Sequence, residues 1–284
     1  MKITLAKSAG FCFGVKRAID IAFQTASCGK EVYMLGDIVH NETVVEKIKR
    51  AGIKKIFRLK PKKNAVLLIS AHGSPKKTYQ KAKKLGFQIV DATCPMVKHI
   101  HTIVKKYERL GFPIIVIGDK KHTEVKAIVG QLSKKALVIE AINTLPYSKI
   151  SKLKKACVVA QSTQNIHKVE TIIKALKHYI NNLKFFNTIC QPTRKKQEEI
   201  HRLPQENDVM IIIGSRTSAN TRRLFEISHS INPHTYWINS ATQLKKKWFE
   251  KAKTVAVTAG ASTPEEIIQE VISTLKTIKN NLCA

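Results

Sequence analysis

The sequence has no CxxC pair among its six cysteines and no apolar run long enough to cross a bilayer. The first absence argues against zinc ribbons and thioredoxin-like redox motifs, and the second argues against a transmembrane segment. A signal peptide is not expected either, because Lys7 interrupts the short apolar run at the N-terminus. We therefore expect a cytoplasmic protein without a membrane partner, whose cysteines are reduced thiols.

Acidic residues are also scarce, since 20 Asp and Glu stand against 50 Lys and Arg, which gives a formal net charge of +30. Such an excess is compatible with a nucleic-acid partner, with an acidic protein partner, or with a codon bias toward lysine. The lysines are scattered, the longest run covers only 245–247, and no nucleic-acid-binding signature of the RNP or paired Cys/His type occurs. We predict no nucleic-acid partner and a basic surface that suits an acidic redox protein.

Apolar runs of strand length alternate with helix-like segments along the chain. The predicted strands cover 2–6, 31–35, 65–70, 88–90, 114–117, 157–160, 183–186, 209–213, 234–238 and 254–257. The predicted helices cover 15–25, 44–51, 76–85, 97–110, 194–203, 222–230 and a closing segment after Pro264. This alternation predicts an α/β fold with small, mostly parallel sheets.

Three cysteines divide the chain into similar parts. Each is followed 24 residues later by a glycine that closes an apolar run: Cys12 by Gly36, Cys94 by Gly118, and Cys190 by Gly214. The pattern G-D-x-x-H also occurs twice, and its two copies are 82 residues apart, the spacing of the first two cysteines. The repeat predicts three similar units in an approximately threefold arrangement that brings three thiolates together.

Polar clusters stand at the end of nearly every predicted strand. They are SAGFC, GDIVHN, AHGS, DATCP, GDKKHTE, QST, NTICQP, GSRTSANT and TAGAST. In open parallel sheets, ligands bind outside the carboxyl ends of the strands. We therefore expect these clusters to form the functional site.

The three repeat cysteines each precede a predicted helix, whose dipole favours the thiolate form. Three convergent thiolates suit a soft metal or an iron–sulfur cluster. With only three ligands, one iron of a four-iron cluster would stay open to substrate. The remaining cysteines, Cys28, Cys157 and Cys283, lie outside the repeat, and we interpret them as structural or incidental.

Three histidines stand at strand ends, and they suit either a metal or an anion: His40, His72 and His122. The glycine- and hydroxyl-rich loops GSRTSANT and TAGAST favour a phosphate ligand, because exposed N–H groups and hydroxyls satisfy several anionic oxygens. His122 and Glu124 form an H-x-E pattern like that of zinc deaminases, but the P-C-x-x-C partner is absent. Glu124, beside an anionic ligand, is a candidate proton donor with a raised pKa.

Motifs in the expected order run from about residue 2 to residue 270: AGFCFGVKRAI, GDIVHN, SAHG, DATCP, NTIC, GSRTSAN and VTAGAS. Together they resemble the family of 4-hydroxy-3-methylbut-2-enyl diphosphate reductases, the iron–sulfur enzymes that end the non-mevalonate isoprenoid pathway. The resemblance implies a pseudo-threefold trefoil of three α/β domains, covering 13–95, 96–191, and 192–284 with 1–12. It also implies one central [4Fe-4S] cluster with three protein ligands: Cys12, Cys94 and Cys190.

The resemblance further implies a role for each polar cluster. Glu124 matches the family's acid, and Ser162 and Thr163 match the hydroxyl pair near the substrate alcohol. The diphosphate-binding side chains match His40, His72, His122, Ser218, Asn220 and Ser262. The implied reaction is the reductive dehydroxylation of an allylic diphosphate to isopentenyl and dimethylallyl diphosphates, with electrons from a reduced ferredoxin or flavodoxin.

The chain departs from the family pattern in a few places. The departures are Thr123 in place of proline, Ala127 and Ile128 in place of Gly-Thr, Ser162 in place of threonine, Lys196 in place of arginine, and Ala219 in place of serine. None removes a cysteine ligand or the acid, so we expect activity. Two alternatives stay open at this point: a phosphate-site enzyme with a mononuclear metal, and a basic nucleic-acid-binding module.

Overall fold

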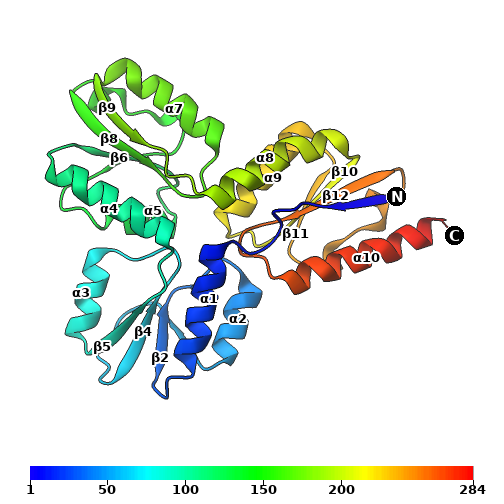
Figure 1. The fold of residues 1–284 in the computed structure, drawn as a ribbon, viewed down its shortest axis with the longest axis horizontal. Coiled ribbons are helices and arrows are strands. Elements are labelled where there is room, and N and C mark those ends of the chain that lie inside the picture. The colour runs from blue at the N-terminus through cyan, green and yellow to red at the C-terminus, as the bar shows by residue number, and fades with distance from the viewer. Residues whose placement is uncertain (284) are drawn as a thin grey trace. The chain divides into compact units, whose positions relative to one another are not determined.

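The computed structural model describes the backbone of residues 1–283 and the side chains of residues 1–280. Strands alternate with helices along the described chain (Figure 1). The strands form three four-stranded sheets, in which all neighbouring strands run parallel. The predicted α/β class is confirmed. No helix in the described part of the chain is long and apolar enough to span a membrane.

The chain forms two compact units. The first comprises Met1–Phe13, His40–Val44 and the chain from Gln191 onward, and the second comprises Gly14–Val39 and Val45–Cys190. The division into three domains at 13–95, 96–191, and 192–284 with 1–12 stays a prediction.

The first sheet has the strand order β3-β2-β4-β5. Its strands are β2 (Val32–Leu35), β3 (Lys54–Ile56), β4 (Ala65–Ile69) and β5 (Phe87–Asp91), and the helices of this part of the chain are α1 (Phe13–Ala26), α2 (Glu42–Arg50) and α3 (Lys76–Lys84).

The second sheet has the equivalent order β7-β6-β8-β9. Its strands are β6 (Ile114–Ile117), β7 (Leu137–Ile139), β8 (Lys155–Ala160) and β9 (Asn182–Phe186), with helices α4 (Pro95–Arg109), α5 (Thr123–Val129), α6 (Tyr147–Ile150) and α7 (Ile166–Tyr179) and the 3-10 turn η1 (Ile142–Thr144).

The third sheet joins the two ends of the chain in the order β1-β12-β10-β11. Its strands are β1 (Lys2–Leu5), β10 (Val209–Ile213), β11 (Thr235–Ile238) and β12 (Thr254–Ala259), with helices α8 (Gln191–Glu206), α9 (Ala219–Ile231) and α10 (Glu265–Cys283) and the 3-10 turns η2 (Ala241–Gln243) and η3 (Lys246–Trp248). Read from the other edge, this is the order of the first two sheets, so β1 takes the place that β5 and β9 hold.

The repeat of cysteine and glycine has a structural cause. Each repeat glycine directly follows β2, β6 or β10. Its N–H donates to the carbonyl of the last residue of the neighbouring edge strand, which is β3, β7 or β11. The three bonds are Gly36 to Ile56 at 3.0 Å, Gly118 to Ile139 at 3.0 Å and Gly214 to Ile238 at 2.9 Å. Each cysteine follows the strand at the opposite edge, which is β1, β5 or β9.

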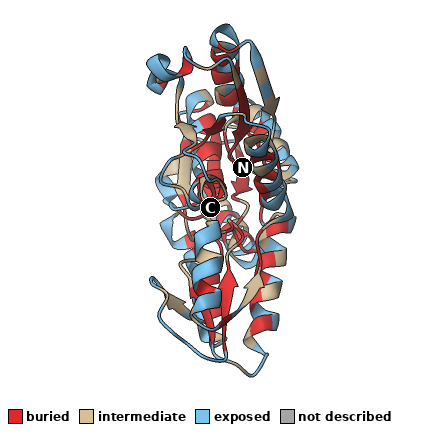
Figure 2. Ribbon diagram, turned by 90° about the vertical axis from the view of Figure 1, so that its left-hand side faces the viewer, coloured by how far each residue is buried: buried red, intermediate tan, exposed pale blue. Residues whose placement is uncertain are grey.

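The strands supply the core. Every residue of β4, β6 and β10 is buried, as expected for parallel strands covered on both faces, whereas the helices keep an exposed side (Figure 2). Burial of these branched aliphatic side chains supplies the hydrophobic stabilisation and holds the polar strand ends in place.

The structure contains elements that the sequence analysis left out. β3 and β7 are three-residue edge strands, too short to show a period of two. α7 carries buried Val169, Ile172, Ile173 and Leu176 at helical spacing, a pattern that the strand-based reading passed over. α5 begins inside the segment that was predicted to be a loop, so Glu124 lies on a helix.

Candidate functional site

The three repeat cysteines occupy equivalent places. Each immediately precedes a helix, since α1, α4 and α8 begin at Phe13, Pro95 and Gln191. Each also donates its backbone N–H to the loop after the third strand of its sheet: Cys12 to Ala261 at 3.1 Å, Cys94 to Ala71 at 2.9 Å and Cys190 to Ser162 at 3.0 Å. The predicted placement of these cysteines before helices is confirmed.

The other cysteines have different surroundings. Cys157 lies in β8 with no exposed surface, and burial raises the pKa of its thiol to about 12. Cys28 is exposed just after α1, whereas Cys12, Cys94 and Cys190 are partly exposed. The side chain of Cys283 lies outside the described residues. A protonated, buried thiol is inert, which supports a structural role for Cys157.

The backbone of α1 packs directly on the side chain of Cys94. A Cβ atom at Gly14, in the first turn of α1, would overlap the Cys94 Sγ atom. The backbone of α1 therefore approaches this sulfur more closely than any residue with a side chain would permit. The thiol chemistry and this close approach fit the binding of a sulfur-ligated cluster.

Glu124 is a buried carboxylate, with 2% of its surface exposed. It lies in the first turn of α5, and both of its oxygens accept hydrogen bonds from Ser162: Oε1 from the backbone N–H at 2.6 Å and Oε2 from the hydroxyl at 2.7 Å. Burial raises the pKa of Glu124, and the two bonds from Ser162 only partly oppose this. A carboxyl group that keeps its proton to a higher pH than usual is suited to acid catalysis.

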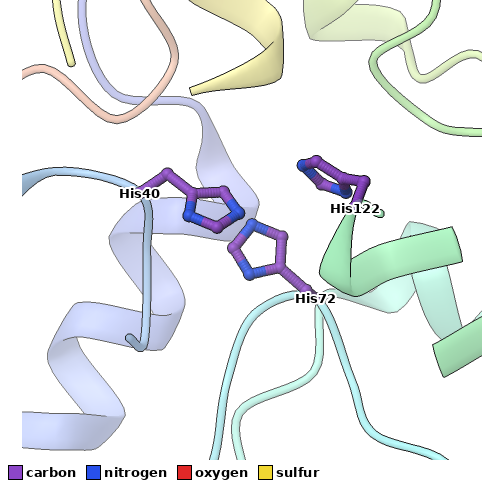
Figure 3. A group of neighbouring side chains, drawn as sticks. All are labelled: His40, His72 and His122. Atoms are coloured by element: carbon purple, nitrogen blue, oxygen red, sulfur yellow. The ribbon is translucent and has the colours of Figure 1, made fainter. Parts of the chain in front are cut away.

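His122 is the N-cap of α5. Its Nδ1 atom accepts a hydrogen bond from the Glu124 N–H at 3.2 Å, which assigns the ring proton of the neutral form to Nε2. The His72 ring meets the His122 ring edge to face, with centroids 5.5 Å apart (Figure 3). The second unit thus brings together two of the three predicted histidines, and His122 is joined to Glu124 by a backbone bond.

Gln161, which is fully buried, precedes the Ser162–Thr163 loop and stabilises it through side-chain hydrogen bonds. The Gln161 side chain accepts from the Asp119 N–H at 3.0 Å and donates to the Thr163 hydroxyl at 3.1 Å. It therefore links the loop after β8 to the loop after β6 that leads to His122. Gln161 is not among the predicted site residues, although its position directly after an apolar strand is a usable signal.

Most of the predicted phosphate-binding side chains belong to the first unit. Ser218 is the N-cap of α9, where its Oγ accepts from the Thr221 N–H at 3.3 Å. Ser262 donates its hydroxyl proton to the His40 carbonyl at 2.8 Å. The first turn of α9 packs on the loop after β12, because a Cβ at Gly260 would overlap the Thr221 hydroxyl.

Asn220 is buried in the first turn of α9, with 4% of its surface exposed. Within the described part of the chain, its Nδ2 atom has no hydrogen-bond acceptor. A buried amide without an acceptor costs free energy, and an anionic ligand would satisfy it. Together with the helix N-terminus, the Asn220 amide offers donors that suit an anion.

If the substrate is the allylic diphosphate that the resemblance implies, we expect the Asn220→Ala substitution to raise its KM roughly 10- to 100-fold, because one hydrogen bond to a charged group is worth about 1.5–3 kcal/mol. The value of kcat should change little, since a bond to the diphosphate is present in both ground and transition states. Steady-state kinetics beside Asn280→Ala, a control at an exposed position of α10, would measure this. An unchanged KM would remove Asn220 from the binding site.

The site residues are therefore grouped by unit. The second unit holds Cys94, Cys190, His72, His122, Glu124, Ser162 and Thr163, and the first unit holds Cys12, His40, Ser218, Asn220 and Ser262. Two further side chains that the sequence analysis did not assign to the site, Lys196 and Glu199, contact the loop before Cys12. The sequence gives little indication of this role for Lys196 and Glu199, because no local pattern relates α8 to a loop about 190 residues away.

Comparison with known proteins gives a consistent result. The family model for LytB protein matches residues 3–276. The chain is 39% identical over 281 residues to 4-hydroxy-3-methylbut-2-enyl diphosphate reductase of Geotalea uraniireducens, covering 99% of each chain. It is 38% identical over 281 residues to the enzyme of the same name from Aquifex aeolicus, covering 97% of this chain and 96% of the relative.

Solved structures agree with these relatives. The structure of E-1-hydroxy-2-methyl-but-2-enyl-4-diphosphate reductase from Plasmodium falciparum matches with a TM-score of 0.90 at 28% identity, covering 97% of this chain and 88% of that one. A second structure, of (E)-4-hydroxy-3-methyl-but-2-enyl diphosphate reductase, matches with a TM-score of 0.72 at 37% identity, covering 98% of this chain and all of that one.

Proposed function

The chain belongs to the LytB protein family, and we propose that it catalyses the reaction for which its relatives are named, the reduction of 4-hydroxy-3-methylbut-2-enyl diphosphate. The carbon–oxygen bond of the substrate alcohol breaks, two electrons and two protons are consumed, and water leaves. The products are isopentenyl and dimethylallyl diphosphates, which end the non-mevalonate pathway. The substrate is thus an allylic diphosphate.

Cys12, Cys94 and Cys190 would hold one [4Fe-4S] cluster as its three protein ligands. Their equivalent positions before three helices support this assignment, and so does the side-chain-free approach of Gly14 to Cys94. When bound, the cluster supplies the two electrons, one at a time. We propose that each of the three predicted domains, 13–95, 96–191, and 192–284 with 1–12, contributes one of these thiolates.

Glu124 supplies the protons. Its carboxyl group is bonded to the Ser162 hydroxyl at 2.7 Å, so a proton can pass to the substrate through this hydroxyl or directly from Glu124. One proton leaves with the alcohol oxygen as water, and the other is added to the allylic carbon. Ser162 and Thr163 would orient the alcohol for this transfer, which lowers the entropic part of the barrier.

The diphosphate is held by groups that change little during the reaction. His40, His72 and His122 would donate charge-assisted hydrogen bonds, and Ser218, Asn220 and Ser262 would add hydroxyl and amide donors at a helix N-terminus. Because His122 is bonded to the Glu124 backbone through Nδ1, binding of the diphosphate at Nε2 would fix the turn that carries the acid. Orientation, rather than electron transfer, is the contribution of these side chains.

The electron donor would be a reduced ferredoxin or flavodoxin. Both are acidic proteins, and the net charge of +30 would speed their encounter with this chain through electrostatic steering. We propose that the reaction takes place in the cytoplasm, a compartment in which thiols stay reduced.

The single observation that carries the proposal is the threefold equivalence of the cysteines, each before a helix and each bonded through its N–H to a strand-end loop. Anaerobic purification should give a brown protein with about four iron and four sulfide ions per chain. Reduced methyl viologen should then support conversion of the allylic diphosphate to both products. A colourless protein that holds only zinc and hydrolyses phosphate esters would replace this proposal with the mononuclear-metal alternative.

A further inference from the structure

Two charged side chains on α8 contact the loop that carries Cys12. Lys196 and Glu199 are three residues apart, so they lie on the same side of the helix. The Glu199 carboxylate accepts the backbone N–H groups of Lys7 and Ser8, both at 2.9 Å, and also the Ser8 hydroxyl. One carboxylate therefore holds three donors at the end of β1.

Lys196 is buried, with 3% of its surface exposed. Its ammonium group donates to the carbonyls of Ser8, of Gly10 at 3.1 Å and of Ala259 at 3.0 Å. Three acceptors match the three protons of an ammonium group, so this buried charge is fully hydrogen-bonded. Burial lowers the pKa of Lys196 to about 8, and the negative charges of a Cys12 thiolate and of Glu199 oppose the shift, so the ammonium form predominates at neutral pH.

The bonded carbonyls belong to two loops that meet at Cys12. Ser8 and Gly10 precede it, and Ala259 ends β12, whose following loop accepts the Cys12 N–H at the Ala261 carbonyl. Gly10 adopts φ +86°, a left-handed conformation that strongly favours glycine. Lys196 and Glu199 therefore fix both segments that determine where the Cys12 sulfur lies.

The other two repeats show that the fold itself does not need this charge. Lys196 is the sixth residue after Cys190, and the sixth residues after Cys12 and Cys94 are Ala18 and Ile100, both fully buried. At the ninth residue, where α8 has Glu199, the other helices have isoleucine. Packing alone would favour apolar residues at these two positions, because burying a charge costs free energy unless hydrogen bonds and ion pairs compensate for the lost hydration.

The position of β1 in the chain gives a physical reason why the loop before Cys12 needs these two charged side chains. Cys94 and Cys190 follow strands that are continuous in the chain with the rest of their own sheets. Cys12 instead follows β1, a four-residue strand that precedes β10, the next strand of its sheet along the chain, by about 200 residues. Because no short connection ties β1 to its partner strand, contacts from other elements are needed to hold this segment in one conformation.

From this geometry we infer that Lys196 and Glu199 are positioning residues for Cys12, which hold its loop in the conformation that a sulfur-ligated cluster requires. The inference rests on the proposed function, because it assumes that Cys12 is a cluster ligand. Residues that orient a ligand in this way commonly change metal affinity when they are replaced.

The test uses the full chain with its cluster assembled anaerobically, in the Lys196→Met, Glu199→Gln and Lys196→Arg variants. Loss of iron to a ferrous chelator should be roughly 10- to 100-fold faster in Lys196→Met, by the range known for such supporting residues. Glu199→Gln should show a smaller acceleration, and Lys196→Arg, which keeps the charge and several donors, should restore most of the retention. Lys195→Met is the matched control, because Lys195 is the exposed neighbour.

Hydrogen exchange on the cluster-free chain separates local positioning from a general loss of stability. In Lys196→Met, exchange should quicken in 7–12 and 259–262 and stay unchanged in β10. Equal acceleration in β10, or iron retention like that of the wild type, would overturn the inference. A wild-type chain that assembles no cluster would instead overturn the proposed function, so the two failures are distinguishable.

Discussion

Replacement of Glu124 by glutamine should lower kcat roughly 10²- to 10⁴-fold, the range expected when a general acid is lost. Glutamine fills the same volume and keeps both contacts to Ser162, with Oε1 accepting from the N–H and Nε2 donating to the hydroxyl, but it cannot release a proton at neutral pH. The cluster content should be unchanged. Single-turnover product formation, measured with the cluster reduced beforehand, would isolate the protonation from electron delivery.

The pH dependence of the free energy of unfolding provides a control for this variant, and its direction follows from the raised pKa of Glu124. The folded state keeps the proton to a higher pH than the unfolded state, so the free energy of unfolding falls as pH rises from the ordinary glutamate value of 4.5 through the folded pKa. Glu124→Gln does not titrate, so above this window it should be more stable than the wild type. Urea unfolding of the cluster-free chain at pH 4 and pH 7.5 would measure the difference. Normal turnover in a folded variant would exclude Glu124 as the acid.

Replacement of Cys190 by serine should abolish measurable turnover and leave less than the full complement of iron. Cys190 immediately precedes α8, and its N–H donates to the Ser162 carbonyl, so serine would occupy the same place without a soft thiolate ligand. Cys94→Ser and Cys12→Ser should behave alike, because the three positions are equivalent in the repeat. Iron and sulfide analysis after anaerobic assembly, with the visible absorption of the cluster, would measure the loss.

Cys28→Ser is the matched control for these variants, since Cys28 is exposed outside the repeat. It should keep the iron content and the turnover of the wild type. Cys157→Ser would be a poor control, because it places a hydroxyl in the fully buried centre of β8. If Cys190→Ser retained a full cluster and normal turnover, the assignment of three protein ligands would be wrong.

The departures from the family pattern have local explanations in two cases. Thr123 is the first residue of α5, a position that tolerates proline but does not need it, because His122 already caps the helix. Lys196 replaces arginine at a position where three carbonyls surround one ammonium group. The structure gives no account of the replacement of serine by Ala219.

The sequence by itself determined the α/β class, the positions of most strands and the places of the functional side chains at strand ends. Periodicity, apolar runs and glycines at strand ends are local patterns, so they can be recognised in the sequence without knowledge of the fold. The strands 114–117 and 209–213 have the predicted bounds for this reason. The constant step from each cysteine to a glycine is equally local, because it spans one helix and one strand.

Only the tertiary structure decided which chemical state these side chains adopt. Burial in the folded chain raises the pKa of Glu124, and Ser162, 38 residues away, donates hydrogen bonds to both of its oxygens, which partly oppose this shift. The His122 tautomer depends on a helix that the sequence analysis took for a loop. Lys196 and Glu199 act on a loop about 190 residues away, where chain folding brings β1 beside β12. Such contacts leave no periodic trace, since their partners are joined through space and not along the chain.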